Sequence, residues 1–138
     1  MRIRTVLTAA GIGLLLTACG VGTDRDLDPS DSIDVRTLQL KLRALMTDPC
    51  HLEPAEQTPR HCEKFVTQLA NTANTVAAAA RTGYPELAGP ADRMTEGIDA
   101  YRKGNCHTTR PDDEDECGEA LSALADALGE VEAQFTQS

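Results

Sequence analysis

The chain has 138 residues, a formal net charge of −9 and an aromatic content of 3% with no tryptophan. Nucleic-acid binding relies on clustered Lys and Arg, and base-stacking platforms rely on aromatic rings. The composition therefore argues against both, and we expect no nucleic-acid partner.

The first segment has the layout of an export signal. Met1 to Arg4 carries two arginines, and residues 5–16 form an uncharged, mainly apolar run. A basic start followed by a short apolar core is typical of a secretory signal peptide. The run is shorter than the roughly 20 apolar residues of a membrane-spanning helix.

The apolar run ends in Leu16-Thr17-Ala18-Cys19-Gly20. This sequence resembles the lipobox of bacterial lipoproteins, and the resemblance covers residues 1–20 only. It implies cleavage before Cys19 and attachment of acyl chains such as palmitate to Cys19. The protein would then be anchored to the cell membrane by lipid, on its extracytoplasmic face. The alternatives are an ordinary signal peptide with an accidental cysteine, or an uncleaved anchor.

Three parts follow from this interpretation: a signal peptide at 1–18, the lipidated Cys19 with a polar tether at 19–30, and a helical domain at 31–138. The tether is charged and broken by glycine and proline. Removing residues 1–18 takes away two arginines and no acidic residue, so the formal charge moves from −9 to −11. Two acyl chains hold a protein stably, so the membrane contact is expected through the lipid alone.

The domain begins with two segments whose apolar residues recur at helical spacing. The first helix should begin near residues 31–32, with Asp34 favouring its positive end, and should stop at residues 47–49. The second should begin at residues 58–59 and end at Gly83. Their apolar stripes consist of Val35, Leu38, Leu42 and Leu45, and of Phe65, Val66, Leu69, Ala73, Val76, Ala77 and Ala80.

Two further helices are expected. The third should begin at Pro85 or at Pro90; we prefer a broken first turn and a main body that starts at Pro90 and stops at Gly104. The fourth should start in the acidic run 112–116. Gly118 and Gly129 lie inside the fourth and weaken it unless they permit close helix contact. The stripes consist of Leu87, Ala91, Met94, Ile98 and Tyr101, and of Leu121, Leu124, Leu128, Val131 and Phe135.

Four amphipathic segments with short connections predict an all-α fold, an antiparallel four-helix bundle. Cys50-His51 and Cys106-His107 each precede a proline-containing loop and a second cysteine seven residues before a Leu-Ala pair. The chain would thus be two helical hairpins, each clamped by cysteines.

Four cysteines remain after lipidation, and an even number in an exported small domain predicts two disulfides. We expect Cys50–Cys62 and Cys106–Cys117, each of which closes a loop of about a dozen residues. The crossed pairing, Cys50–Cys117 with Cys62–Cys106, stays open because all four would cluster at one end of a bundle. That end would be the pole opposite the tether. A partner would be met there, unless the bridges serve stability alone.

Other chemistry finds less support. His51, His61 and His107 each lie near a cysteine, but the spacing lacks the close ligand pairs of zinc sites, so no metal site and no cofactor are expected. An EF-hand loop counted from Asp113 places Leu124 where glutamate is required. No catalytic signature is present, so we expect no catalytic residues and no enzyme.

The most consistent interpretation is a membrane-anchored, exported lipoprotein whose helical domain is a non-catalytic module of the cell envelope that binds a protein partner. One alternative is a lipoprotein that binds a metal or small ligand. The other is an enzyme of unrecognised type.

Overall fold

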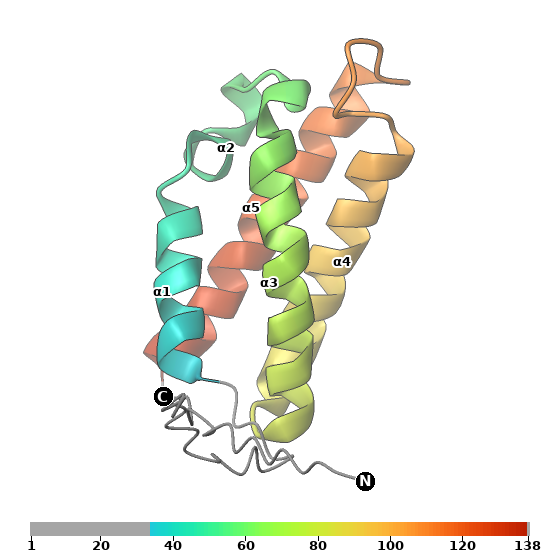
Figure 1. Ribbon diagram of the computed structural model, residues 1–138. Helices are drawn as coiled ribbons and strands as arrows, with labels where there is room; N and C mark the ends of the chain where they lie inside the picture. Colours follow the sequence, from blue (N-terminus) through green and yellow to red (C-terminus); the bar gives the residue numbers. More distant parts are fainter. Residues whose placement is uncertain (1–33, 138) are drawn as a thin grey trace, which may run out of the picture. The chain divides into compact units, whose positions relative to one another are not determined.

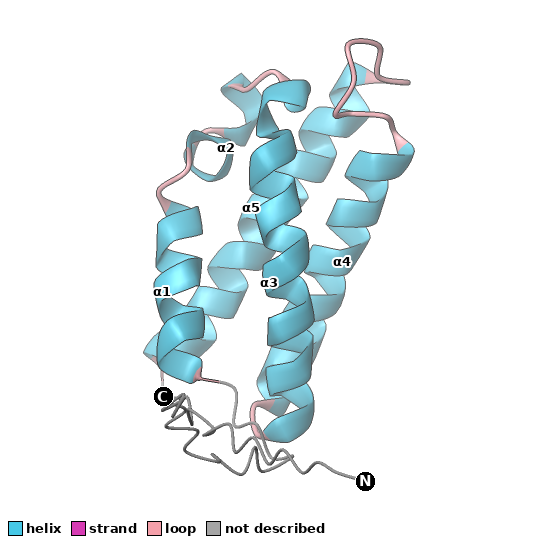
Figure 2. Ribbon diagram, viewed as in Figure 1, coloured by secondary structure: helices cyan, strands magenta, loops and turns pink. Residues whose placement is uncertain are grey.

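The computed structural model describes residues 34–137 (Figure 1). The predicted signal peptide, Cys19 and the tether lie outside these residues. Within 34–137 every regular element is helical and no strand occurs (Figure 2), as the sequence predicts for the fold class. In this part of the chain no helix combines the length and apolar content that crossing a membrane requires.

Helix α1, Val35–Met46, is capped by Asp34, and the start predicted near residues 31–32 lies outside the described residues. The Asp34 side chain accepts hydrogen bonds from the backbone N–H groups of Arg36 and Thr37, at 3.1 and 3.3 Å, and Asp34 itself has an extended backbone. A carboxylate in this position satisfies free donors of the first turn. Hydrogen bonds from Thr37 hold the pKa of Asp34 below its ordinary value.

The connection after α1 contains three short helical turns, and the sequence analysis anticipated only the last of them, as the start of the second helix at residues 58–59. They are α2 (Pro49–Leu52) and the 3-10 turns η1 (Pro54–Glu56) and η2 (Pro59–Cys62). Each has proline in its first turn, where its missing N–H would have no intrahelical partner. Proline thus both ends the preceding helix and starts the next turn.

The remaining helices occupy the predicted segments. Helix α3, Glu63–Thr82, ends at Gly83 as predicted, but it begins at Glu63 rather than at residues 58–59, where the 3-10 turn η2 stands. A 3-10 turn, η3 (Pro85–Leu87), leads into α4, Ala88–Lys103, which ends at Gly104. The expected start of the main helix at Pro90 is two residues late, because proline in the first turn removes no hydrogen bond from the ladder. Helix α5, Glu114–Thr136, starts within the acidic run.

The four long helices lie side by side, with α1 and α4 running in one direction and α3 and α5 in the other (Figure 1). Contacts join α1 to α3, α3 to α4, α4 to α5 and α5 to α1. The predicted stripes face the core, apart from four members that are half-buried: Val35, Ala77, Ala80 and Phe135. The largest fully buried side chains include Tyr101, Phe65, Leu38 and Met94.

One close approach between helices depends on a glycine. A Cβ added at Gly97 in α4 would lie 2.9 Å from Cγ and Cδ2 of Leu124 in α5, closer than carbon atoms tolerate. Nothing lies within 4 Å of the corresponding position at Gly118 or Gly129. The suggestion that those two permit close contact is therefore wrong, and Gly97 serves that purpose.

Candidate functional site

Two disulfides close the connections at one end of the helical unit, opposite the first turn of α1 (Figure 1). Cys50 is joined to Cys62, with a Cα–Cα distance of 5.7 Å, and Cys106 is joined to Cys117, at 5.5 Å. These are the pairings preferred on loop length, and the crossed alternative does not occur. We call the two segments, residues 48–62 and 104–117, the first and second clamped connections.

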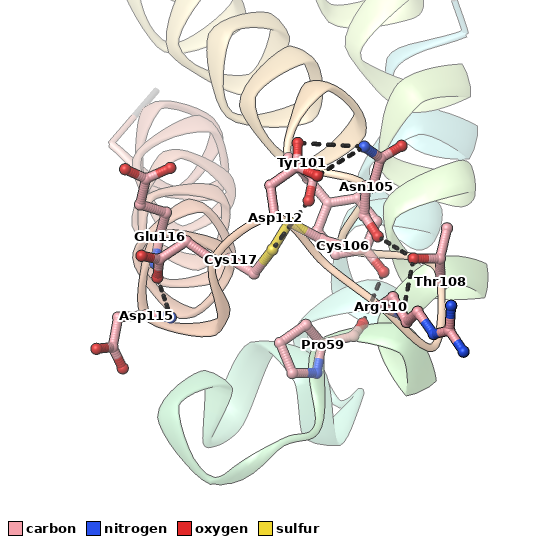
Figure 3. Close-up of a disulfide and its surroundings, with 12 residues drawn as sticks. Pro59, Tyr101, Asn105, Cys106, Thr108, Arg110, Asp112, Asp115, Glu116 and Cys117 are labelled. Atoms are coloured by element: carbon pink, nitrogen blue, oxygen red, sulfur yellow. Dashed lines mark hydrogen bonds between the residues drawn. A yellow bond between two sulfur atoms is a disulfide. The ribbon is translucent and has the colours of Figure 1, made fainter.

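The second clamped connection is held by its own polar contacts (Figure 3). Asn105 has a positive φ of 53°, and its side-chain amide donates to both carboxylate oxygens of Asp112, at 3.1 and 3.2 Å. The Thr108 hydroxyl donates to the Asn105 carbonyl at 2.8 Å, and the Asp112 N–H donates to the Gly104 carbonyl at 3.0 Å. Each contact joins residues of the connection itself.

The first clamped connection depends more on its surroundings. Within it, the Asp48 carboxylate accepts from the Cys50 N–H at 2.9 Å. Its turns α2, η1 and η2 all contact α5. The Tyr101 hydroxyl, at the end of α4, donates to the Pro59 carbonyl at 2.6 Å. Burial, with a smaller contribution from the Glu63 charge, raises the pKa of Tyr101 to about 12.

The three histidines occupy different environments. His51 is half-buried, its Nδ1 is buried without a hydrogen-bond partner, and His61 and His107 are exposed. Burial lowers the pKa of His51, and the charges of Asp126 and Asp48 oppose that shift in part. Residues 34–137 contain no cluster of three or more His, Cys, Asp or Glu side chains arranged to hold a metal ion.

The acidic run divides into two roles. Asp113 caps α5 by accepting from the N–H groups of Asp115 and Glu116, at 2.8 and 3.1 Å, and Asp112 accepts from Asn105. The next three residues, 114–116, form the first turn of α5, where negative charge is favoured by the helix dipole. The run is therefore a helix start, as the sequence analysis preferred over a calcium loop.

Acidic residues are concentrated along α5. Residues 111–138 contain nine Asp and Glu and no Lys or Arg, whereas residues 34–110 contain nine acidic and ten basic residues. The net negative charge of the described domain thus comes almost entirely from its last helix and the residues next to it.

A surface groove runs between α4 and α5, and we call it the α4–α5 groove. Its lining combines five exposed carboxylates with residues no larger than alanine: Glu96, Glu116, Glu119, Asp126 and Glu130, and Gly97, Ala100, Ala120, Ala123 and Ala127. The one cation in the lining is Arg93, which is ion-paired with Glu130. A second hollow, between residues 55–59 and α5, shares Glu119, Ala123 and Asp126 with it.

The sequence analysis did not identify this groove. A usable signal was present in the absence of Lys and Arg after Arg110 and in the spacing of residues 116, 119, 123, 126 and 130, which alternates between three and four. The sequence could not show that this face of α5 lies beside Gly97 and Ala100 of α4.

No protein-family model matches the chain, and no curated protein and no solved structure shows significant similarity to it.

Proposed function

We propose that the protein is an exported lipoprotein, cleaved before Cys19 and held at the extracytoplasmic face of the cell membrane by acyl chains on Cys19. The observation that carries this is the order of residues 1–20: two arginines, an uncharged apolar run, and Leu16-Thr17-Ala18-Cys19. Each part has a separate role in export, cleavage or acylation, and the parts stand in the required order.

The chemistry of the helical domain supports export. Disulfides persist in oxidising compartments and are rare where thiols are kept reduced. This domain contains two, and the four cysteines that form them are at most 6% exposed. A small, alanine-rich core gains stability from such links, as extracellular domains of this size commonly do.

We also propose that the four long helices form an antiparallel four-helix bundle made of two clamped hairpins. The alternating directions of α1, α3, α4 and α5 and the cyclic order of their contacts support this. A bundle of this kind places the first and third connections at one end, and both disulfides are found together there.

The role we propose for the domain is binding of a protein partner, without catalysis. The described cysteines are joined in bridges, and each shifted pKa has a structural cause: a helix cap at Asp34, burial at His51, and burial at the hydrogen-bonded Tyr101. Connections fixed by disulfides and local hydrogen bonds lose little entropy when they are bound. They are suited to presenting a defined surface.

Metabolic labelling with palmitate tests the anchor. The wild-type protein should incorporate label and fractionate with membranes, whereas Cys19→Ala should carry no label and accumulate as an uncleaved or misplaced precursor. Gly20→Ala, which keeps a small residue beside the cysteine, is the matched control and should be labelled normally. Normal labelling of Cys19→Ala would refute the lipoprotein assignment.

A further inference from the structure

The carboxylates in the second half of α5 do not serve the stability of that helix. Asp126 and Glu130 are four residues apart on one face, and like charges at this spacing repel each other. Asp126, Glu130 and Glu132 also lie in the half of α5 whose end carries negative partial charge, and the last turn contains no basic residue. Ordinary solvated helices relieve both effects with Lys and Arg.

The α4–α5 groove is long enough to receive several turns of a helix. From Glu116 to Glu130, α5 advances about 21 Å at 1.5 Å per residue. Ala120 and Ala127 are buried in the floor, and Ala100 and Ala123 add only methyl groups to its exposed part. A floor of small residues allows the side chains of a third helix to reach the surface of the first two.

The edges of the groove specify the charge of its occupant. Four carboxylates of α5 and one of α4 line it, and its single cation is already paired with Glu130. A small apolar centre with a charged rim is a common design of protein interfaces, and complementary charge then selects the partner and speeds the encounter. For this acidic groove, the complementary occupant carries positive charge.

We infer that the α4–α5 groove is a docking site for a cationic amphipathic helix of a protein partner, with Lys and Arg along the edges of its apolar stripe. This inference rests on the proposed partner-binding role and specifies the partner's chemistry. Such a helix would place cations beside Glu116, Glu119 and Asp126, so its binding should raise the melting temperature of the domain.

The test uses the full-length chain in a non-ionic detergent and a fluorescent helical peptide of about 15 residues, with an alanine and leucine stripe flanked by lysine and arginine. Fluorescence anisotropy should show saturable binding with one peptide per chain, and the association rate should fall as salt is added. A peptide of the same composition, reordered so that no apolar stripe forms, should bind at least about tenfold more weakly.

Variants separate the groove from general electrostatic attraction. Glu119→Lys, and separately the pair Ala100→Gln and Ala123→Gln, should each weaken binding at least about tenfold, one by reversing an edge charge and the other by filling the floor. Glu86→Lys, an equal charge change on an exposed residue of η3 outside the groove, should leave affinity within about twofold. Circular dichroism and unfolding curves should match the wild type for all of them.

Several outcomes would overturn the inference. Equal binding of the reordered peptide, an equal loss with Glu86→Lys, or no loss in the two-glutamine variant would leave only diffuse attraction. Self-association that Glu119→Lys abolishes would make a second copy the occupant, and stoichiometric displacement of the peptide by Ca²⁺ would make it a cation. If the peptide fails while photo-crosslinking in intact cells captures one defined partner at the clamped connections, the groove is excluded and the proposed function stands.

Discussion

The two clamped connections solve the same structural problem by different means. Both link long helices at one end of the molecule, and both contain a disulfide between residues 11 or 12 positions apart. The second is stabilised from within, by the contacts of Asn105, Thr108 and Asp112. The first is stabilised from outside, by α5 and by the hydroxyl of Tyr101. Loops of similar length, each closed by a disulfide, can therefore differ in how far their order depends on contacts with the rest of the fold.

Removing each disulfide should produce the largest effect. Replacing Cys50 and Cys62 with alanine, or Cys106 and Cys117, should lower the free energy of unfolding by about 3 kcal/mol in either case, because loops of similar length lose similar entropy. Urea denaturation would measure this. Hydrogen exchange should then distinguish the two variants. Protection should be lost throughout residues 50–62 when Cys50 and Cys62 are replaced, but retained at Asp112 when Cys106 and Cys117 are replaced. The reverse pattern would contradict the comparison.

Asn105→Ala should destabilise the second clamped connection by about 1.5 kcal/mol, because alanine is disfavoured at positive φ and lacks the amide that binds Asp112. Asn105→Gly tolerates the backbone conformation but also lacks the amide, so it should recover part of the loss. Thermal unfolding of both variants gives the two contributions. If glycine and alanine are equally harmful, the backbone conformation is not the cause.

Tyr101→Phe should act on the first clamped connection alone and cost about 1 kcal/mol, because the Pro59 carbonyl loses its donor while the buried ring is retained. The wild type should also lose stability between pH 10 and about 12, where the unfolded chain releases the Tyr101 proton and the folded chain keeps it. Unfolding curves against pH would show this loss in the wild type and a smaller one in Tyr101→Phe. If hydrogen exchange in Tyr101→Phe increased in residues 105–112 and not in the first clamped connection, the Tyr101 hydroxyl would be shown to stabilise the second connection instead.

The smallest effect should come from His51, in the first clamped connection. Its pKa is lowered by burial, so between its folded and unfolded values the unfolded chain binds the proton and the folded chain does not. Stability is therefore fully present above about pH 6.5 and declines as the pH falls through the folded value. His51→Asn should flatten this part of the profile, whereas His107→Asn, at an exposed site, should not. An unchanged profile in His51→Asn would show that other groups cause the acid sensitivity.

Sequence reasoning succeeded where local rules decide the structure. The apolar spacing identified the core faces of four helices, and Gly83 and Gly104 end helices as expected. The start of α1 could be placed only approximately, because several polar residues precede the helix and only geometry shows that Asp34 caps it. The turns α2 and η1 were missed, and η2 was expected to be the first turn of the second helix, because single turns leave no periodicity to detect.

The candidate site was less predictable because it is defined by tertiary neighbours. The disulfide pairs followed from loop length, but Tyr101 counted only as a core residue, and nothing in the sequence linked its hydroxyl to Pro59. Likewise, the acidic stripe on α5 lines a groove only because α4 places the small residues Gly97 and Ala100 beside it.

The close approach of Leu124 to Gly97 also limits how far α4 and α5 can slide along each other. Leu124 fills the space that a side chain at residue 97 would take. A slide of either helix along its axis would set Leu124 against a residue that carries a side chain in place of Gly97. This contact therefore helps to hold the register of the two helices, and with it the position of Glu96 relative to the carboxylates of α5 that line the groove. Any molecule that binds this face therefore meets carboxylates at the same spacing on every copy of the protein.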